Sequence, residues 1–479
     1  MAASVQHAYG YAWRSSKFLI IATACIALLT GIPPSPVVVE TLLYGFVVPI
    51  LPYMLEVRLH RDPGETQSLT TGLLSIHGFV TLISAPVTAA LLDKTANRKI
   101  PLLLSLAMCL TGTLLVAFTP TFWLLYLGRI LQALAGSAAW LVCVAMLTEN
   151  AGERSVGRMM GLSMSFVMTG TIGGPIVGGA LLEWLGYWPA WCVPLGILLL
   201  DIIARLIMIE PPRQPRSDGS SATARDVAKA DIENTETSPL LPPLPQVETA
   251  ETEPQASDTT RPAGQSDGFY FEMLRDVRVL ASLANSIVYS AIIAGFNTTL
   301  PVHLRQIFNW GSLNVGMTIF ILQVPTIFFG PLSGWLRDRV GLRYPTTVGW
   351  VLLVPLMWCL GVPGNPTFPW ADAESHGKAI FISCMAGIGV VSTLVQGSGF
   401  LHTIAVVQDI ESKRPNIFGA HGGRSRAFAM NSVGFNLGQM LGPLLAGYLS
   451  EAIGYYYMNV TLAAGCLVVA LVSFTHFVF

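Results

Sequence analysis

The stretch GTIGGPIVGG, residues 170–179, decides the fold class, because glycine and proline recur in it at fixed spacing within a long apolar run. A second stretch, GQMLGPLLAG, residues 438–447, repeats the pattern 268 residues later. In a soluble helix an interior glycine costs about 1 kcal/mol and an interior proline about 3 kcal/mol relative to alanine. Both stretches therefore need a reason other than helix propensity, and the close approach of helices inside a membrane is one.

The composition calls for a bilayer as the solvent. Of the 479 residues, 52% are hydrophobic and only 11% are charged, whereas charged residues make up about 25% of an average globular protein. A chain this apolar cannot cover its surface with polar groups in water. The net charge of −1 gives no reason to expect a nucleic-acid partner. The seven cysteines form no C-x-x-C pair, so we expect neither a disulfide framework nor a metal or other cofactor.

Apolar runs divide the chain into two halves. A bilayer core needs about 20 apolar residues per helix, and an irregular first run from residue 18 precedes eleven clear ones: 71–92, 101–118, 122–147, 157–182, 188–209, 280–308, 313–336, 345–360, 379–407, 428–449 and 455–477. The predicted organisation is an N-terminal segment (1–17), a six-helix half (18–209), a linker (210–277) and a second six-helix half (278–479). The linker is rich in Pro, Ser, Thr and Glu, which predicts disorder.

Lysine and arginine set the expected orientation. They gather in the connections on the side of the linker and of both termini, for example Lys94, Arg154 and Lys413, and are sparse on the other side. Such residues collect in cytoplasmic loops. We therefore expect both termini and the linker in the cytoplasm. The protein itself is expected in either the plasma membrane or the vacuolar membrane.

The two halves repeat each other. The glycine-proline run falls in the fifth and the eleventh span, and an acid followed by basic residues comes after the second span (Asp93) and the eighth (Asp338). Twofold repetition in a helical membrane protein is typical of secondary transporters, whose binding site lies at the interface of the repeats near the midplane. The chain contains no cluster spaced for covalent catalysis and no phosphate-binding G-x-x-x-x-G-K-[ST] run, so we do not expect an enzyme.

Short motifs carry a resemblance to a known family. The loop GWLRDRVGLR, 334–343, resembles the G-x-x-x-D-R-x-G-x-R loop of the major facilitator superfamily. The stretch GRILQALAG resembles its R-x-x-Q-G signature at Arg129, with Ala133 in place of the usual glycine. The resemblance covers the whole chain except the linker. It implies an all-α integral membrane protein with the major facilitator fold, twelve transmembrane helices in two pseudo-symmetric six-helix halves.

The resemblance also implies a function. The glycine-proline run of the fifth span resembles a signature of exporters, and ETLLYGFVVPILPYML, 40–55, is similar to the first span of the vesicular amine transporter branch. We therefore expect a proton-coupled transporter that exports or sequesters small amphipathic or cationic organic molecules by alternating access. Its partners would be the small-molecule substrate, protons and the bilayer, and we expect a monomer.

Two charged residues inside apolar spans are the candidates for proton coupling, Glu40 and Arg129. A charge at the bilayer centre costs roughly 2.5–3.5 kcal/mol, so keeping one there implies a partner or a proton. Alternatively, Glu40 lies at the membrane boundary and Arg129 binds backbone carbonyl groups. Asp201 and Arg205, four residues apart, are expected to form a structural ion pair.

The remaining candidates form three groups. A cytoplasmic latch between helix ends is expected from Asp93, Arg98, Asp338, Arg339 and Arg343, or these charges only set the topology. A seam between the halves, or helix packing alone, is expected at the antiporter-type motif residues Gly170, Gly174, Pro175, Gly178, Gly179, Gly438, Gly442 and Pro443. Contact with substrate, or interhelical hydrogen bonding instead, is expected of Tyr44, Asn297, Gln323, Asn431 and Asn436.

Two departures from the resemblance leave alternatives open. Ser432 stands where the amine branch has aspartate, and the tenth span has no acid before Asp409, so amine recognition and proton stoichiometry stay open. An uncoupled facilitator, a nutrient importer or a transport-dead sensor or scaffold is the alternative function. The prolines of GIPPSPVVV, 31–39, interrupt the first span. We hypothesise a retained intron or an erroneous gene model here, and a mature transcript that encodes these prolines would refute the hypothesis.

Overall fold

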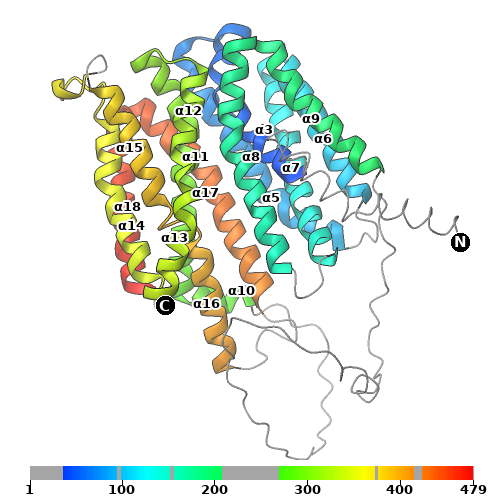
Figure 1. The fold of residues 1–479 in the computed structure, drawn as a ribbon, viewed down its shortest axis with the longest axis vertical. Helices are drawn as coiled ribbons and strands as arrows, with labels where there is room; N and C mark the ends of the chain where they lie inside the picture. The colour runs from blue at the N-terminus through cyan, green and yellow to red at the C-terminus, as the bar shows by residue number, and fades with distance from the viewer. Residues whose placement is uncertain are drawn as a thin grey trace, which may run out of the picture. The chain divides into compact units, whose positions relative to one another are not determined.

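The computed structural model describes residues 36–93, 99–150, 156–207, 269–372, 376–414 and 423–477. By its contacts the chain divides into two units, and the unit formed by residues 1–210 and 268–479 contains all of these ranges. The regular secondary structure within the described ranges is helical throughout (Figure 1).

Helices stand at the eleven clear predicted spans and over residues 36–58 of the irregular first one, of which residues 18–35 lie outside the described part of the chain. The first half contains α3 (Pro36–Val47), α4 (Leu51–Tyr53), η1 (Met54–Arg58), η2 (Pro63–Glu65), α5 (Thr66–Asp93), α6 (Lys99–Phe118), α7 (Phe122–Asn150), α8 (Val156–Leu185) and α9 (Tyr187–Ile207). The second half contains α10 (Phe269–Arg275), α11 (Val277–Phe308), α12 (Ser312–Gln323), α13 (Pro325–Val340), α14 (Arg343–Gly361), η3 (Pro369–Ala371), α15 (Gly377–Ser392), α16 (Ser398–Lys413), α17 (Arg424–Ile453) and α18 (Tyr455–His476). Helix α10 lies within the last residues that the sequence assigns to the linker.

Three of the spans are not straight single helices. The first bends by 52° between Thr41–Val47 and Leu51–Arg58, where the prolines of the V-P-I-x-P run lack the N–H that a continuous helix needs. The eighth, Ser312–Val340, is interrupted only at Val324, between α12 and α13, where Pro325 lacks a backbone N–H. The tenth is divided into α15 and α16 by a turn that ends at Gly397, whose φ of 74° lies in the left-handed region. The apolar runs of the sequence predict neither division.

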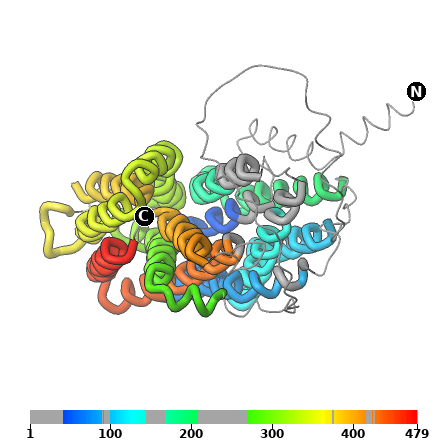
Figure 2. The backbone as a smooth tube through the Cα atoms, turned by 90° about the horizontal axis from the view of Figure 1, so that it is seen from below, coloured from blue at the N-terminus to red at the C-terminus, as the bar shows by residue number. Residues whose placement is uncertain are grey.

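The bundle has two distinct ends. We call the end where α9 finishes and α11 begins the linker end, and the opposite end the far end. Figure 2 looks along the bundle and shows the blue to blue-green helices of the first half mainly on one side and the green-to-red helices of the second half mainly on the other. Exposed tryptophans lie at the far end of the first half, Trp123, Trp184 and Trp188. Tryptophan collects at membrane–water interfaces, so this arrangement fits a helix bundle that crosses a bilayer.

The glycine-proline run of α8 packs two different helices. A Cβ atom at Gly178 would collide with the carbonyl oxygen of Phe46 in α3, a helix of the same half. The neighbouring Gly179 faces the carbonyl oxygen of Ser312 in α12, a helix of the other half. On the same seam, Gly316 of α12 faces the carbonyl oxygen of Pro175. The run therefore brings α8 into backbone contact with both halves.

The equivalent run of α17 repeats this arrangement with the halves exchanged. Gly442 packs on the carbonyl oxygen of Ala291 in α11, within the second half, and Gly447 packs on Thr71 of α5, in the first half. At the position equivalent to Gly178 the chain carries Ala446, and here the facing helix supplies the glycine, Gly295. Both repeats thus require two backbones to approach closely, and either of the two helices can provide the small residue.

Candidate functional site

A buried polar cluster joins four helices of the first half. Arg129 of α7 is only 1% exposed, and its guanidinium carbon lies 5.6 Å from the ring centroid of Tyr44 in α3. The Tyr44 ring lies 5.0 Å from the His77 ring of α5. Arg129 also donates a 3.1 Å hydrogen bond to Gln132, which in turn donates one of 3.0 Å to Thr113 of α6. We call these five residues the Arg129 cluster.

The packing of α3 on α8 fixes the depth of Glu40. Gly174 lies against Leu42, and Gly178 lies against Phe46, so the two helices run parallel in this region. Glu40 precedes Leu42 by two residues and is therefore level with about residue 172 of α8, near the middle of that 30-residue helix. Glu40 also precedes Tyr44, a member of the Arg129 cluster, by about one helical turn. Its backbone thus stands at mid-depth, although its side chain lies outside the described atoms.

A small cavity lies beside both helix breaks. It measures about 30 Å³ and receives Gln323 and Thr326 from the α12–α13 break, and Ser392 and Gln396 from the α15–α16 break. Met168 of α8 brings the first half to the same space. Discontinuous helices frequently form the sites of secondary transporters because they free backbone groups near the midplane. A drug-sized ligand needs about 300–1,000 Å³, so this space would have to widen to hold one.

Arg337 secures the break in the tenth span. Its Nη2 donates hydrogen bonds of 2.9 Å to the carbonyl oxygens of both Thr393 and Gln396. Ser333 donates a further bond of 2.7 Å to the Thr393 oxygen. These bonds satisfy carbonyl groups that a helix end leaves unpaired. The sequence analysis did not select Arg337, although the four-residue spacing from Ser333 places both polar side chains on one face of an apolar helix.

The other predicted substrate residues occupy different places. Asn431 accepts a 2.6 Å hydrogen bond from Ser286, so the alternative of an interhelical bond is confirmed for this residue. Asn297 is buried in α11, and Asn436 is partly buried in α17. Gln323 lines the small cavity and Tyr44 belongs to the Arg129 cluster. Contact of these five residues with a substrate stays a prediction.

The expected charges at the linker end are only partly visible. Asp338 and Arg339 are exposed, and the Arg339 guanidinium lies 4.6 Å from the Trp335 ring centroid. Arg343 lies 4.5 Å from the ring centroid of Phe474. Arg98 and the side chain of Asp93 lie outside the described residues, so the latch stays a prediction.

The ion pairs described near the linker end involve other residues. Arg278 at the start of α11 pairs with Asp276 at 2.7 Å and with Asp409 of α16 at 2.9 Å. In α9, Asp201 and Arg205 form the expected ion pair at 3.4 Å. The network around Arg278 joins α11 to α16, whereas the sequence alone identifies Asp409 only as the first acid of the tenth span.

Comparison with known sequences identifies the family. The sequence profile of the Major Facilitator Superfamily matches residues 37–404, which is more than half of the chain. The chain is a member of the major facilitator superfamily. It is therefore a multi-pass membrane transporter and not an enzyme, and the expected fold class is confirmed.

Individual relatives of the facilitator are distant. An uncharacterized MFS-type transporter of Schizosaccharomyces pombe is 28% identical over 463 residues, which cover 96% of both chains. The vesicular acetylcholine transporter of Torpedo torpedo is 22% identical over 93% of this chain and 78% of its own length. Among solved structures, the nucleoside transporter NupG covers 93% of the facilitator and 98% of its own chain, with a TM-score of 0.62 and 14% identity. The last likeness concerns the fold alone.

Two carboxylates of the first half contact the second half at the far end. Glu56 at the end of the first span forms an ion pair of 2.8 Å with Arg305 of α11 and accepts a 3.1 Å hydrogen bond from Thr66. Glu183 at the end of α8 accepts a 2.9 Å bond from the backbone N–H of Leu313, where the N-terminus of α12 favours negative charge. Both contacts join the two halves, and the sequence analysis missed them because polar residues at span ends usually face only water.

Removing the Glu56 carboxylate should weaken the contact between the two halves at the far end. We expect Glu56→Gln to increase the labelling rate of a cysteine placed at Thr71→Cys by about two- to fivefold, because a partly exposed ion pair contributes up to about 1 kcal/mol. Thr71 is buried against Gly447 on the seam between the halves and becomes accessible only when they part. The measurement is maleimide labelling in an otherwise cysteine-free protein, with exposed Glu65→Gln as the control. Equal rates in all three proteins would show that the ion pair does not hold the far end.

Proposed function

We propose that the facilitator exchanges protons for small organic cations and removes these cations from the cytoplasm by alternating access. The observation that supports this most is the Arg129 cluster, in which a buried arginine lies over Tyr44, about one helical turn from the mid-depth position of Glu40. Charged groups at this depth are costly and mark substrate or proton pathways. Glu40 would hold a proton in one state and release it when a cation takes its place.

The two glycine seams would allow the movement. Alternating access requires the halves to rock against each other around a fixed site. The α8–α12 and α5–α17 seams are the tightest described contacts between the halves, since backbone meets backbone at Gly179 and a glycine meets a side chain at Gly447. Glu56 and Glu183 would release their partners when the far end opens. The latch at Asp93, Arg98, Asp338, Arg339 and Arg343 would close the linker end in that state.

The substrate class rests on a distant likeness. Relatives include vesicular acetylcholine transporters, which favours a substrate with an ammonium group. Gln323, Thr326, Ser392 and Gln396 would supply hydrogen bonds once the cavity at the helix breaks widens. Ser432 replaces the aspartate of the amine branch, so a single acid, Glu40, would have to alternate between proton and cation in the middle of the membrane.

The orientation follows from the positive residues of the sequence. With the linker end in the cytoplasm, a structure closed at the far end would load its substrate from the cytoplasm. The linker would be cytoplasmic, as would both termini, and the protein would work as a monomer. Export at the plasma membrane and sequestration in the vacuole differ only in the compartment behind the far end.

Transport driven by an imposed proton gradient tests the proposed function. Purified protein in sealed liposomes with an acidic interior should accumulate members of a panel of fluorescent cationic dyes and amines, because protons leave as cations enter. Collapsing the gradient with an ionophore should abolish accumulation. Uptake that only equilibrates the cation concentration across the membrane, with or without the gradient, would show that transport is not coupled to protons and overturn the proposal.

A further inference from the structure

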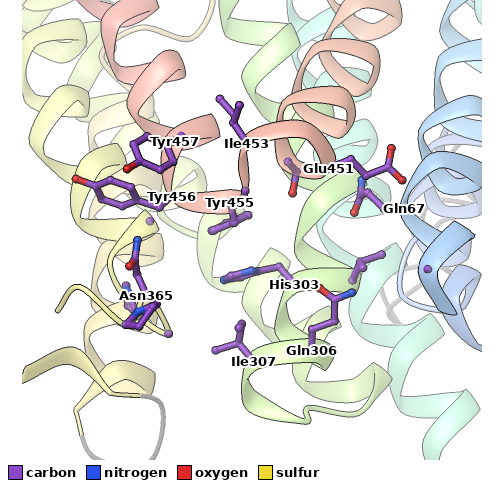
Figure 3. A pocket seen from close by; sticks show the side chains of 18 of the residues that line it. Gln67, His303, Gln306, Ile307, Asn365, Glu451, Ile453, Tyr455, Tyr456 and Tyr457 are labelled. Carbon is purple, nitrogen blue, oxygen red and sulfur yellow. The ribbon is translucent and has the colours of Figure 1, made fainter. Parts of the chain in front are cut away.

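A further cavity lies at the far end, and its lining shares no residue with the Arg129 cluster or with the small cavity at the helix breaks. It measures about 420 Å³ and lies between the start of α5, the end of α11 and the α17–α18 connection. Figure 3 shows Gln67, His303, Gln306, Glu451 and the tyrosines of α18 around the same space. Its volume is within the range of about 300–1,000 Å³ that small-molecule sites occupy.

The lining favours a cation. Glu451 contributes a carboxylate, whereas no lysine or arginine is among the described residues that line the cavity. Tyr455, Tyr456 and Tyr457 contribute three aromatic rings. Aromatic faces attract ammonium groups, and the attraction increases as the cation loses its water. Figure 3 shows the carboxylate beside Gln67 and the Tyr456 and Tyr457 rings on the opposite side, so the two features favour an organic ammonium ion over an anion in different parts of the cavity.

His303 gives this cavity an unsatisfied polar group. The side chain is only 8% exposed, and its ring stacks on Tyr455 with centroids 3.5 Å apart. Within the described part of the chain its Nε2 is buried and has no hydrogen-bond partner. A buried polar atom without a partner is unfavourable. A bound molecule that carries its own hydrogen-bonding group would satisfy it.

We propose that this cavity is a second binding site, which takes a small organic ammonium ion and stabilises the closed far end. The stabilisation follows from the lining, because the cavity is lined by both halves. Gln67 belongs to the first half, and His303, Glu451 and the tyrosines belong to the second. Gln67 already donates a 3.4 Å hydrogen bond to the carbonyl oxygen of Thr298 across the same boundary. A ligand that contacts both sides would oppose their separation. The site does not depend on proton coupling at Glu40.

Binding of 2-phenylethylammonium, whose N–H groups can donate a hydrogen bond to His303, tests the site directly. The probe is titrated into the full-length protein in lipid nanodiscs, with propylbenzene as the neutral molecule of the same shape. We expect the cation but not the neutral molecule to bind, and Glu451→Gln to weaken binding at least tenfold. Tyr457→Ala, at a residue 59% exposed, should weaken it severalfold, and Glu65→Gln should have no effect.

One further variant, Glu40→Gln, distinguishes binding at the second site from binding at the transport site. The affinity that Glu451→Gln removes should persist in Glu40→Gln. Binding that is lost in Glu40→Gln but unchanged in Glu451→Gln and Tyr457→Ala would belong to the transport site and overturn the proposal. Equal binding of the cation and the neutral molecule would overturn it as well.

Labelling of Thr71→Cys tests the effect on conformation. Saturating 2-phenylethylammonium should slow maleimide labelling severalfold, and the effect should disappear when Glu451→Gln is added. Unchanged or faster labelling with the site occupied would show that a ligand there does not stabilise the closed far end.

Discussion

Gly178→Ala should lower the melting temperature of the facilitator by roughly 5–10 °C, whereas Gly173→Ala should leave it unchanged or raise it slightly. The two glycines lie five residues apart in the same helix. A Cβ atom at Gly178 collides with the carbonyl oxygen of Phe46, which belongs to a backbone and cannot rotate away. A Cβ atom at Gly173 meets nothing within 4 Å, and alanine favours a helix over glycine by about 1 kcal/mol.

The measurement is thermal unfolding of both variants and wild type in the same detergent. Gly295→Ala provides an independent check in the second half, because a Cβ atom there would lie 2.8 Å from the Cβ of Ala446. It should also lower the melting temperature. Equal melting temperatures for Gly178→Ala and Gly173→Ala would mean that the run serves some purpose other than close packing of α3 and α8.

The sequence predicts the positions of the spans well, because each helix that crosses the bilayer core needs a run of about 20 apolar residues. The runs 71–92 and 122–147, for example, correspond to Thr66–Asp93 and Phe122–Asn150. The breaks near Pro325 and Gly397 escape this reasoning, since the chain on both sides of each break stays apolar. At the break near Gly397, local turn bonds such as Gln396 N–H to the Ser392 carbonyl oxygen and the two hydrogen bonds from Arg337 compensate for the missing helical bonds.

The candidate site is predictable only in part. Arg129 could be found because an arginine in an apolar run is expensive, and Gln323 because it is polar within a span. Arg305 and Glu56 lie at span ends, where charged residues are ordinary, so only their 2.8 Å separation reveals the pair. The depth of Glu40 depends on the register of α3 against α8, which contacts such as Phe46 with Gly178 define and the sequence alone does not.

Glu40→Gln should have the largest effect on transport. Glutamine keeps the size and the hydrogen-bonding capacity of the side chain but can neither carry the proton nor balance a cation. We therefore expect uphill accumulation of cations to stop and the pH dependence of transport to disappear, while folding is retained. Glu65→Gln, an exposed acid outside the spans, is the matched control and should behave as wild type. A folded Glu40→Gln protein that still accumulates cations would move the coupling role to another residue.

Substrate-driven proton flux in sealed liposomes is the most direct test of the central claim. Wild type, Glu40→Gln and Glu65→Gln are compared as cationic dyes and amines are added, with a pH-sensitive dye inside the liposomes. The account predicts substrate-dependent proton flux in wild type and Glu65→Gln, and flux at the level of empty liposomes in Glu40→Gln. Cation movement without proton flux in wild type, or equal flux in Glu40→Gln, would contradict proton exchange through Glu40.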